Sequence, residues 1–477
     1  MTPLIVAGPT GLMKHDGGPR HPERQARVFA VMEGVRDLDL GDEVIYPAFG
    51  EARREELARV HAGAYLNELE VFCAQGGGDI DPDTYARDDS WVAARRAAGA
   101  GLAALAELEA RGEGVAFVPV RPPGHHATVD RAMGFCLVNN VAVAAASRTA
   151  RGERVLIVDW DVHHGNGTQD IFWDDPHVLY VSTHQHPLYP GTGRPTEVGG
   201  TGAPGLTLNL PVPPGATGDV LRAAIDEVAR PTIEEFAPDW VLVSCGFDAH
   251  ESDPLSETRL SSGDFAELAR VVREFAPAPG RLALFLEGGY DLDALRASVE
   301  ATLAALLDLP SRPPPPTVGG PGLTRLRDDH TERLRAIDRV HDQGVPLRRA
   351  SSWRATTAPT APATLWSGRP ARRSRPARSC ASCTRSGCSS TPGWPARRPS
   401  TATRRSPERR RPGSTEAGCT GLSTTATRAP PCCARPSRHG RREPRCCWSS
   451  AHAARAVTPG RCSAAPAWSW SSTRPTR

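Results

Sequence analysis

Short apolar runs alternate with longer amphipathic or alanine-rich stretches through the first 310 residues. Short runs rich in Val, Leu and Ile are typical of strands that are buried on both faces of a parallel sheet. On this basis we predict strands at 4–7, 43–46, 115–120, 154–159, 178–182, 206–210, 240–245 and 281–286. The intervening stretches predict helices at 21–36, 51–59, 64–73, 90–111, 140–150, 217–235, 261–275 and 292–307.

This alternation predicts an α/β fold with a central, mostly parallel sheet that is covered by helices on both sides. A single domain, residues 1–310, is expected to contain all of these elements. Residues 76–79 are predicted to form a loop, and Ser90 is expected to cap the helix that follows it. Three acids alternate around this loop, and we interpret them as solvated turn residues rather than as a cation-binding loop: Asp79, Asp81 and Asp83.

The composition changes near residue 350. Residues 351–477 contain 24 Arg, no Asp, three Glu and nine of the twelve Cys, with neither helical nor strand periodicity. The net charge of +3 therefore hides a charge of −18 on residues 1–350. We predict a Pro-rich linker with a short helical segment at 311–350, followed by a tail at 351–477 that cannot bury enough apolar surface to fold.

Two explanations of this tail remain open. It is either a disordered basic arm for nucleic acid or an acidic membrane, or an out-of-frame translation of a GC-rich gene. The second is favoured, because nine Cys and six Trp are poorly suited to a soluble arm. The first part of the chain has three Cys, no secretory signal and no membrane-length apolar run, so we expect a cytoplasmic location without membrane contact.

Polar residues follow four of the predicted strands. Because the carboxyl ends of parallel strands meet at one edge of a sheet, these side chains are expected to lie together. They are His125 and His126, then Asp159, Asp161 and His163, and finally Asp248 and Tyr290.

Two carboxylates and one imidazole, from Asp161, His163 and Asp248, form a three-ligand set that leaves a position for water, as a catalytic zinc site requires. Such a metal lowers the pKa of bound water from about 15.7 to about 7. The paired imidazoles of His125 and His126 could then take and return a proton.

The remaining polar residues suit the same chemistry. A buried carboxylate at Asp159 would hold one imidazole in its tautomer, and Asn166 could orient the other. Tyr290, which follows two glycines, could donate to an oxyanion that forms on an attacked carbonyl. Together these parts predict metal-assisted hydrolysis of an amide.

Five motifs in this order resemble those of the histone deacetylase family: RPPGHHA at 121–127, GFC at 134–136, DWDVHHGNGTQ at 159–169, GFDAH at 246–250 and LEGGY at 286–290. The residues within these motifs most resemble the class II-like branch of the family, which includes bacterial acetylpolyamine amidohydrolases and acetoin-utilisation-type deacetylases. The resemblance covers about residues 15–310. It implies the arginase/deacetylase fold and zinc-dependent removal of acyl groups from lysine side chains or small acylated amines.

Residue by residue, the resemblance implies one Zn²⁺ per chain on Asp161, His163 and Asp248, with the tandem histidines moving the proton and Tyr290 polarising the carbonyl. It also implies a structural K⁺ near Asp159, Asp161, His163 and Ser182. The acyl-lysine channel would be walled by Phe135 and Tyr189, with Leu255 at its rim and Gly134 in its floor. The apolar Leu255 disfavours polyamines, and the rim aspartate used by some members cannot be placed in the segment 74–90.

Two alternatives remain open. One is a binuclear manganese ureohydrolase of the same fold, and the other is a catalytically inactive module that binds acyl-lysine. The acidic first part of the chain favours cationic substrates and disfavours nucleic acid as a partner of the catalytic domain. Oligomerisation is compatible with the sequence, which does not specify it.

Overall fold

The computed structural model describes residues 2–8 and 15–342. The chain divides into two units, Met1–Pro362 and Ala363–Arg477, and all described residues belong to the first. The predicted tail at 351–477 lies outside the described residues. Within the described part of the chain, no helix is long and apolar enough to span a membrane.

Eight strands form one sheet in the order β2-β1-β5-β10-β9-β6-β7-β8. Every neighbouring pair is parallel, which confirms the predicted α/β class. The strands are β1 (Leu4–Val6), β2 (Val44–Ile45), β5 (Val115–Val118), β6 (Val155–Asp159), β7 (Val178–Gln185), β8 (Thr207–Val212), β9 (Trp240–Cys245) and β10 (Leu282–Leu286).

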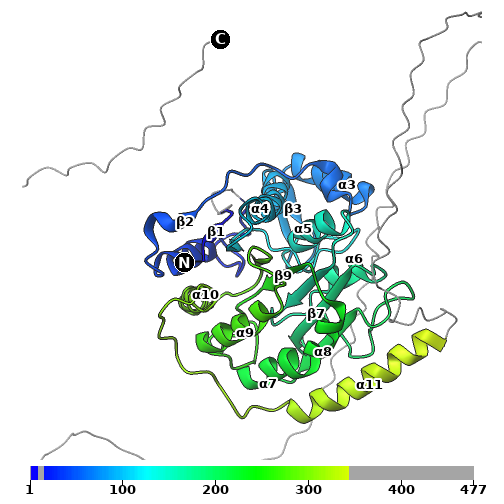
Figure 1. The fold of residues 1–477 in the computed structure, drawn as a ribbon. Helices are drawn as coiled ribbons and strands as arrows, with labels where there is room; N and C mark the ends of the chain where they lie inside the picture. The colour runs from blue at the N-terminus through cyan, green and yellow to red at the C-terminus, as the bar shows by residue number, and fades with distance from the viewer. Residues whose placement is uncertain (1, 9–14, 343–477) are drawn as a thin grey trace, which may run out of the picture. The chain divides into compact units, whose positions relative to one another are not determined.

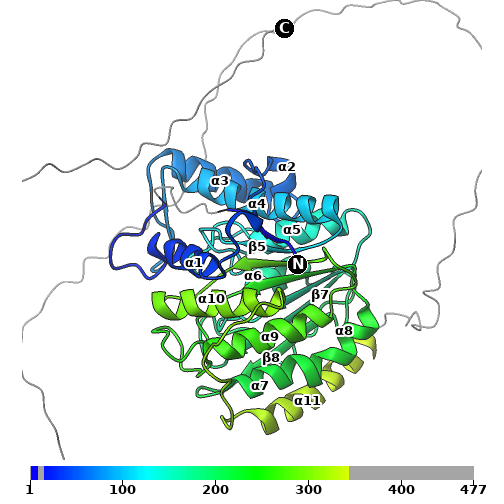
Figure 2. The ribbon, with the colours of Figure 1, turned by 60° about the vertical axis from the view of Figure 1, so that its left-hand side comes forward.

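Helices cover both faces of this sheet (Figures 1 and 2). On one face lie α2 (Arg54–Leu57), α3 (Gly63–Ala74), α4 (Ser90–Arg111), α5 (Asn140–Thr149) and α6 (Asn166–Phe172). On the other lie α1 (Ala26–Arg36), α7 (Gly218–Ala223), α8 (Arg230–Phe236), α9 (Ser262–Glu274) and α10 (Leu292–Leu306).

Two hydrophobic cores result, one on each face of the sheet. In β6, Val155 and Ile157 belong to one core, whereas Leu156 and Val158 belong to the other. Successive side chains of a strand point to opposite faces, so a strand between two helical layers needs apolar residues at every position. This requirement explains why the strands are continuous apolar runs, and it leaves their polar residues to the strand ends.

The predicted helix at 21–36 begins only at Ala26. Residues before it form a turn, in which Glu23 N donates to His21 Nδ1 over 3.1 Å. The Glu23 carboxylate is buried and bonds the guanidinium of Arg121. A local side-chain bond and a buried ion pair therefore replace the first turns of the expected helix. The helix expected at 51–59 is likewise reduced to α2.

The predicted loop at 76–79 is wrong, because this segment forms a strand. β3 (Gly77–Asp79) pairs antiparallel with β4 (Tyr85–Arg87). Gly77 has a φ of +71°, and a Cβ there would overlap the carbonyl oxygen of Ala86. The glycine that suggested a loop is thus required by the close approach of the two strands.

Ser90 is the first residue of α4 rather than its cap. Its Oγ accepts a hydrogen bond from Arg87 N over 2.6 Å and lies 2.7 Å from His15 Nδ1. The hydroxyl therefore joins β4 and the N-terminal segment to the helix.

The predicted helix at 217–235 is not uniform. A π-helical stretch at Ala224–Ala229 separates α7 from α8, which carries a proline, Pro231, in its first turn. Proline has no N–H for the i−4 bond, so the preceding turn widens locally.

The segment 311–342 lies within the range 311–350, for which a Pro-rich linker with a short helical segment was predicted, and its helix is longer than expected. It contains the 20-residue helix α11 (Leu323–Asp342; Figure 1). This helix packs against β8, which is the edge strand of the sheet. Leu326 is buried in the core, and the buried guanidinium of Arg333 donates to Gly205 O over 2.8 Å. The low content of apolar residues in α11 concealed this packing, because the stem of an arginine supplies part of it.

Candidate active site

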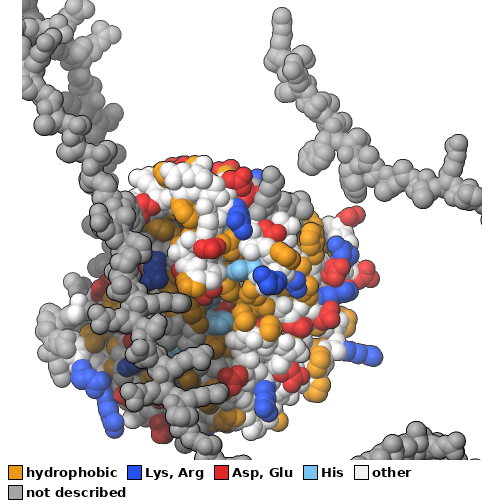
Figure 3. Space-filling view, turned by 180° about the vertical axis from the view of Figure 1, so that it is seen from behind, with side chains coloured by type: hydrophobic (Ala, Val, Ile, Leu, Met, Phe, Trp, Pro, Cys, Tyr) orange, Lys and Arg blue, Asp and Glu red, His pale blue; other side chains and the backbone are white. Residues whose placement is uncertain are grey.

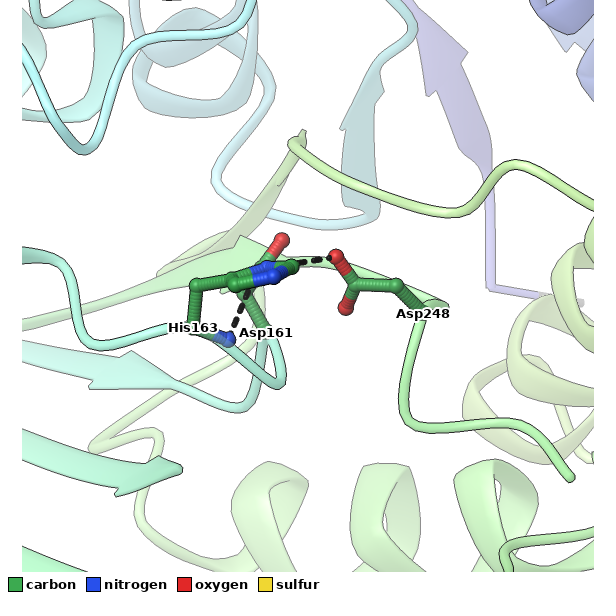
Figure 4. Close-up of side chains that lie close together, drawn as sticks. All are labelled: Asp161, His163 and Asp248. Atoms are coloured by element: carbon green, nitrogen blue, oxygen red, sulfur yellow. Dashed lines mark hydrogen bonds and ion pairs between the residues drawn. The ribbon is translucent and has the colours of Figure 1, made fainter. Parts of the chain in front are cut away.

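Asp161, His163 and Asp248 lie together just beyond the carboxyl ends of β6 and β9 (Figure 4). One ligand atom from each side chain lies within 4.8 Å of the others. The Nδ1 atom of His163 is 3.2 Å from Asp161 Oδ1 and 3.1 Å from Asp248 Oδ2. Ligand atoms of a tetrahedral Zn²⁺ are about 3.3 Å apart, given metal–ligand distances of about 2.0 Å. The cluster therefore has the spacing of a three-ligand metal site.

The charges of this cluster also fit a divalent cation. All three side chains are buried. Burial and the neighbouring Asp161 raise the pKa of Asp248. Burial lowers the pKa of His163, but its bonds to the two carboxylates raise it to about 10. A divalent cation held by these three side chains would offset the charge of the two buried carboxylates.

Backbone amides and glycines hold the two carboxylates in place. Asp161 Oδ2 accepts from Gly288 N over 2.7 Å, and Asp248 Oδ1 accepts from Val162 N over 2.8 Å. A Cβ at Gly246 would overlap the Asp161 carboxylate, and one at Gly288 would overlap that of Asp248. Both positions require glycine, since the backbone passes directly against the ligands.

The tandem histidines follow β5 and lie beside the cluster of Asp161, His163 and Asp248. His125 Nδ1 is 3.0 Å from Asp159 Oδ2, and His126 Nδ1 is 2.8 Å from Asn166 Oδ1. An amide oxygen only accepts hydrogen bonds, so Nδ1 of His126 carries the hydrogen and Nε2 is left to accept a proton. Each imidazole thus has the orienting partner expected from the sequence.

The two imidazoles have opposite electrostatic environments. Burial lowers the pKa of His125, but the charges of Asp159 and Asp161 raise it to about 10. Burial and the charge of His125 hold the pKa of His126 well below its usual value. The pair therefore offers one cationic and one neutral imidazole to the same space.

A pocket of about 340 Å³ lies over the cluster. Its lining includes every residue that was predicted for the substrate channel, namely Gly134, Phe135, Tyr189 and Leu255. Both tandem histidines, His163 and Tyr290 line it as well. The ring of Phe135 meets that of Tyr290 edge-on at a centroid distance of 5.9 Å, and Tyr189 meets His126 in the same way at 5.1 Å. The aromatic walls therefore contact the reactive groups directly.

Three residues of the site were not identified from the sequence. Arg27 Nε donates to Gly289 O over 2.6 Å, and its guanidinium lies 4.9 Å from the centre of the Tyr290 ring. Glu287 is fully buried, and its Oε2 accepts from Gly124 N over 2.6 Å and from His125 N over 3.1 Å.

Burial raises the pKa of Glu287 to about 7. A charged residue at the end of an apolar strand was a usable signal for Glu287, whereas nothing in the sequence marked Arg27. The third missed residue is Asp83, which lines the pocket mouth although it was interpreted as a solvated turn acid.

Ser182 is buried in β7 opposite Asp159 of β6, where the K⁺ was expected. Its Oγ lies 2.9 Å from His184 Nδ1. Among residues 2–8 and 15–342, the Asp161 cluster is the single group of three or more metal-ligating side chains. Asp159 bonds His125 and Tyr180 rather than joining that cluster.

The eight-stranded parallel sheet covered by helices on both faces, with this cluster at its carboxyl edge, is consistent with the arginase/deacetylase fold. The histone deacetylase domain model matches residues 21–306. The chain therefore belongs to the histone deacetylase family, as the motifs predicted, and this membership implies deacetylase activity on acetylated substrates.

Relatives from plants and archaea show the same similarity. The chain is 40% identical over 313 residues to "Histone deacetylase 10, chloroplastic" of Oryza sativa subsp. japonica, covering 61% of this chain and 70% of that protein. It is 37% identical over 344 residues to a "Probable deacetylase" of Archaeoglobus fulgidus, covering 69% and 95%. The crystal structure of the HDA15 HD domain aligns with a TM-score of 0.64 at 33% identity, covering 72% of this chain and 99% of that one.

Proposed function

We propose that this protein is a zinc-dependent deacylase that hydrolyses the amide of acetyl-lysine or of a related small acylated amine. The observation that carries the proposal is the convergence of the Asp161 cluster, the histidine pair and Tyr290 on one pocket. One Zn²⁺ per chain would be held by Asp161, His163 and Asp248. When bound, it supplies a Lewis acid for the amide carbonyl and lowers the pKa of water from about 15.7 to about 7.

The histidine pair moves the proton. Nε2 of His126 accepts it from the attacking water, because Nδ1 already donates to Asn166. The same nitrogen returns the proton to the departing amine. His125, paired with Asp159, keeps a positive charge next to the reacting carbonyl and offsets the negative charge that develops there.

Tyr290 donates its hydroxyl hydrogen to the carbonyl oxygen as that oxygen becomes negative. Burial raises the pKa of Tyr290 well above its usual value, so the phenol keeps its proton at neutral pH. A preorganised donor of this kind contributes about 100-fold or more to turnover.

The pocket supports an acyl-lysine side chain as substrate. Phe135, Tyr189 and Leu255 give it apolar walls that suit a four-carbon stem. Asp83 at the mouth is an acceptor for a backbone or ammonium N–H group. The net charge of −18 on residues 1–350 attracts cationic peptides or amines.

The proposal also includes a structural K⁺ near Asp159, Asp161, His163 and Ser182. Its support is the parallel pairing of Asp159 with Ser182 directly beneath the metal cluster. This ion would offset part of the negative charge buried there.

A cytoplasmic location, without nucleic acid or membrane as a partner of the catalytic domain, completes the proposal. Cys73, Cys136 and Cys245 are all free and buried, which suits a reducing compartment. On the face drawn in Figure 3, basic, acidic and apolar side chains are intermixed around two small groups of histidine atoms, without a continuous basic stripe among the coloured residues. Self-association remains compatible with this proposal.

A substrate panel tests the proposal. Acetyl-lysine peptides and acetylpolyamines are incubated with the purified full chain, with and without a zinc chelator, and metal content is measured by elemental analysis. We expect chelator-sensitive turnover, a preference for lysine peptides and one zinc per chain. Asp248→Ala is expected to lose both metal and turnover, because it removes one of three ligands.

Other outcomes identify the alternatives. Two manganese ions per chain with turnover of a guanidino compound would identify a ureohydrolase. Binding of acetyl-lysine peptide by the zinc-loaded chain without turnover would identify a binding module. Either result would contradict the deacylase.

A further inference from the structure

The segment that carries Tyr290 is intrinsically flexible, because two glycines precede the tyrosine. Gly289 has a φ of +115°, a conformation that other residues rarely adopt. Gly288 cannot be replaced either, since a Cβ there would overlap the Asp248 carboxylate. The segment itself therefore cannot be stiffened, and the phenol has to be positioned by contacts from other parts of the chain.

Asp253 makes such a contact. Its Oδ2 accepts from Tyr290 N over 2.7 Å and, at longer range, from Asp291 N over 3.4 Å. Its Oδ1 accepts from Leu255 N over 3.0 Å. One carboxylate thus joins the loop that carries the pocket rim to the segment that carries the tyrosine.

The placement of Asp253 is electrostatically unfavourable, apart from these bonds. The residue is 6% exposed, and burial together with the charge of Asp248 raises its pKa to about 7. A buried carboxylate near another carboxylate is destabilising unless backbone donors satisfy its oxygens. Here both oxygens have such donors, and those donors belong to two residues that line the pocket.

We propose that Asp253 is a positioning residue that aligns the Tyr290 hydroxyl and the Leu255 rim through a single carboxylate. The inference rests on the proposed function, in which Tyr290 donates to the substrate carbonyl. Arg27 bonds the Gly289 carbonyl just before the tyrosine, so the Tyr290 peptide is held on both sides. A tyrosine without the Asp253 bond would sample positions from which its hydroxyl misses the substrate oxygen.

The substitution Asp253→Asn tests this role with almost no change of shape. Asparagine has one acceptor oxygen, so either Tyr290 N or Leu255 N would face an NH₂ group instead. On an acetyl-lysine peptide we expect kcat to fall by about 10-fold or more, as misplacement of a reacting group does. Zinc content should remain at one per chain, since none of the three metal ligands changes.

A double-mutant cycle with Tyr290→Phe separates positioning from general damage. If Asp253 acts through the phenol, then Asp253→Asn should lower the residual kcat of the Tyr290→Phe protein by less than about twofold. A merely structural role would lower kcat by the same factor in both backgrounds, and that result would overturn the proposal.

Asp264→Asn is the matched control. Asp264 is also a buried acid whose two oxygens accept from different backbone amides, from Thr317 N over 3.0 Å and from Ser261 N over 2.8 Å. It does not line the pocket. We expect this variant to melt at a lower temperature than the wild type while its kcat is unchanged.

The remaining outcomes are also decisive. A folded, zinc-loaded Asp253→Asn protein with wild-type kcat would overturn the inference. If that variant does not fold, Asp253→Glu displaces the carboxylate by one methylene, and wild-type kcat in this second variant would overturn the inference instead. Absence of turnover in the wild-type chain would contradict the proposed function itself rather than the role of Asp253.

Discussion

At the scale of the residue, spacing along the chain predicts which side chains act together. Asp161 and His163 are two positions apart directly after β6, and the amide of His163 donates to Asp161 Oδ1 over 2.9 Å. Asp159 precedes them on the same side and bonds His125 instead. One short stretch therefore supplies two of the three proposed metal ligands and, at Asp159, a carboxylate that bonds a different residue.

The hydroxyl of Tyr290 provides a prediction at this scale. Tyr290→Phe removes the oxyanion donor and leaves all three metal ligands in place, so kcat should fall by about 100-fold or more while zinc content is unchanged. Steady-state kinetics and elemental analysis check both parts. Tyr46→Phe is a suitable control, because Tyr46 is 56% exposed and lies outside the pocket. Wild-type kcat in Tyr290→Phe would remove the role given to the phenol.

At the scale of the element, the sheet delivers the reactive groups and a small hairpin completes the pocket. Strands β5, β6, β9 and β10 each end beside a residue of the proposed site. The β3–β4 hairpin contributes Asp83, and Thr84 beside it accepts a hydrogen bond from Phe135 N over 3.1 Å. The hairpin therefore positions one wall of the channel.

Gly77 is the position at which this hairpin is most easily disrupted. Gly77→Ala combines a φ of +71° with overlap against the Ala86 carbonyl, and should lower the free energy of unfolding by about 2–3 kcal/mol. It should also raise KM through Phe135. Urea denaturation and peptide kinetics measure these effects.

Gly112→Ala isolates the effect of overlap. Gly112 has a similar φ of +68°, but a Cβ there would meet no atom within 4 Å. We expect the free energy of unfolding to fall by about 1 kcal/mol and KM to remain unchanged. Equal losses of stability in both variants would mean that the close approach at Gly77 has no energetic effect.

At the scale of the whole molecule, one folded unit with two cores contains every residue of the proposed site. Residues 1–350 of the chain carry a net charge of −18, whereas residues 351–477 contain 24 Arg and three Glu. The described fold closes with α11, which ends at Asp342. Function is therefore expected to depend on the first part of the chain alone.

Deletion of residues 351–477 tests this expectation. Because all pocket and metal-cluster residues precede residue 300, the truncated protein should retain wild-type kcat and KM on an acetyl-lysine peptide. A control truncation that also removes α11, ending at residue 310, should lower the melting temperature, since Leu326 and Arg333 are buried. A large loss of turnover in the 1–350 protein would mean that the tail takes part in function.

Buried histidines provide a pH prediction at the same scale. Burial lowers the pKa of His15, His61 and His184 to about 4. Between pH 6.5 and 4 the unfolded chain binds more protons at these positions than the folded chain, so stability must decrease as the pH falls through this range. Each histidine contributes about 3 kcal/mol to the free energy of unfolding. This contribution is fully present above pH 6.5 and is lost as the pH falls towards 4.

His61→Gln checks this linkage. Urea midpoints are measured from pH 7.5 to 4.5 for the wild type and for the variant, under the same metal conditions. The variant should be less stable at pH 7.5, because Asn139 N donates to His61 Nε2 over 3.0 Å, but it should lose less stability on acidification. Parallel pH curves for the two proteins would contradict the prediction.

The sequence by itself determined the fold class, and it predicted which polar side chains meet at the carboxyl edge of the sheet. Residues buried on both faces of a sheet must be apolar, so the polar groups that follow the strands were visible as exceptions, from His125 to Tyr290. The sequence was misleading where a local preference yielded to tertiary contacts. Gly77 suggested a loop but pairs in a strand, and the helical segment expected within the linker is α11, which packs on the fold through Leu326 and Arg333.

Only the tertiary structure decided how the parts are held in place. Asp253, Glu287 and Arg27 bond backbone groups of distant segments, and a bond to a backbone group leaves no pattern in the sequence of either partner. Local spacing predicts side chains that share a strand end, whereas long-range bonds to the backbone exist only after the chain has folded.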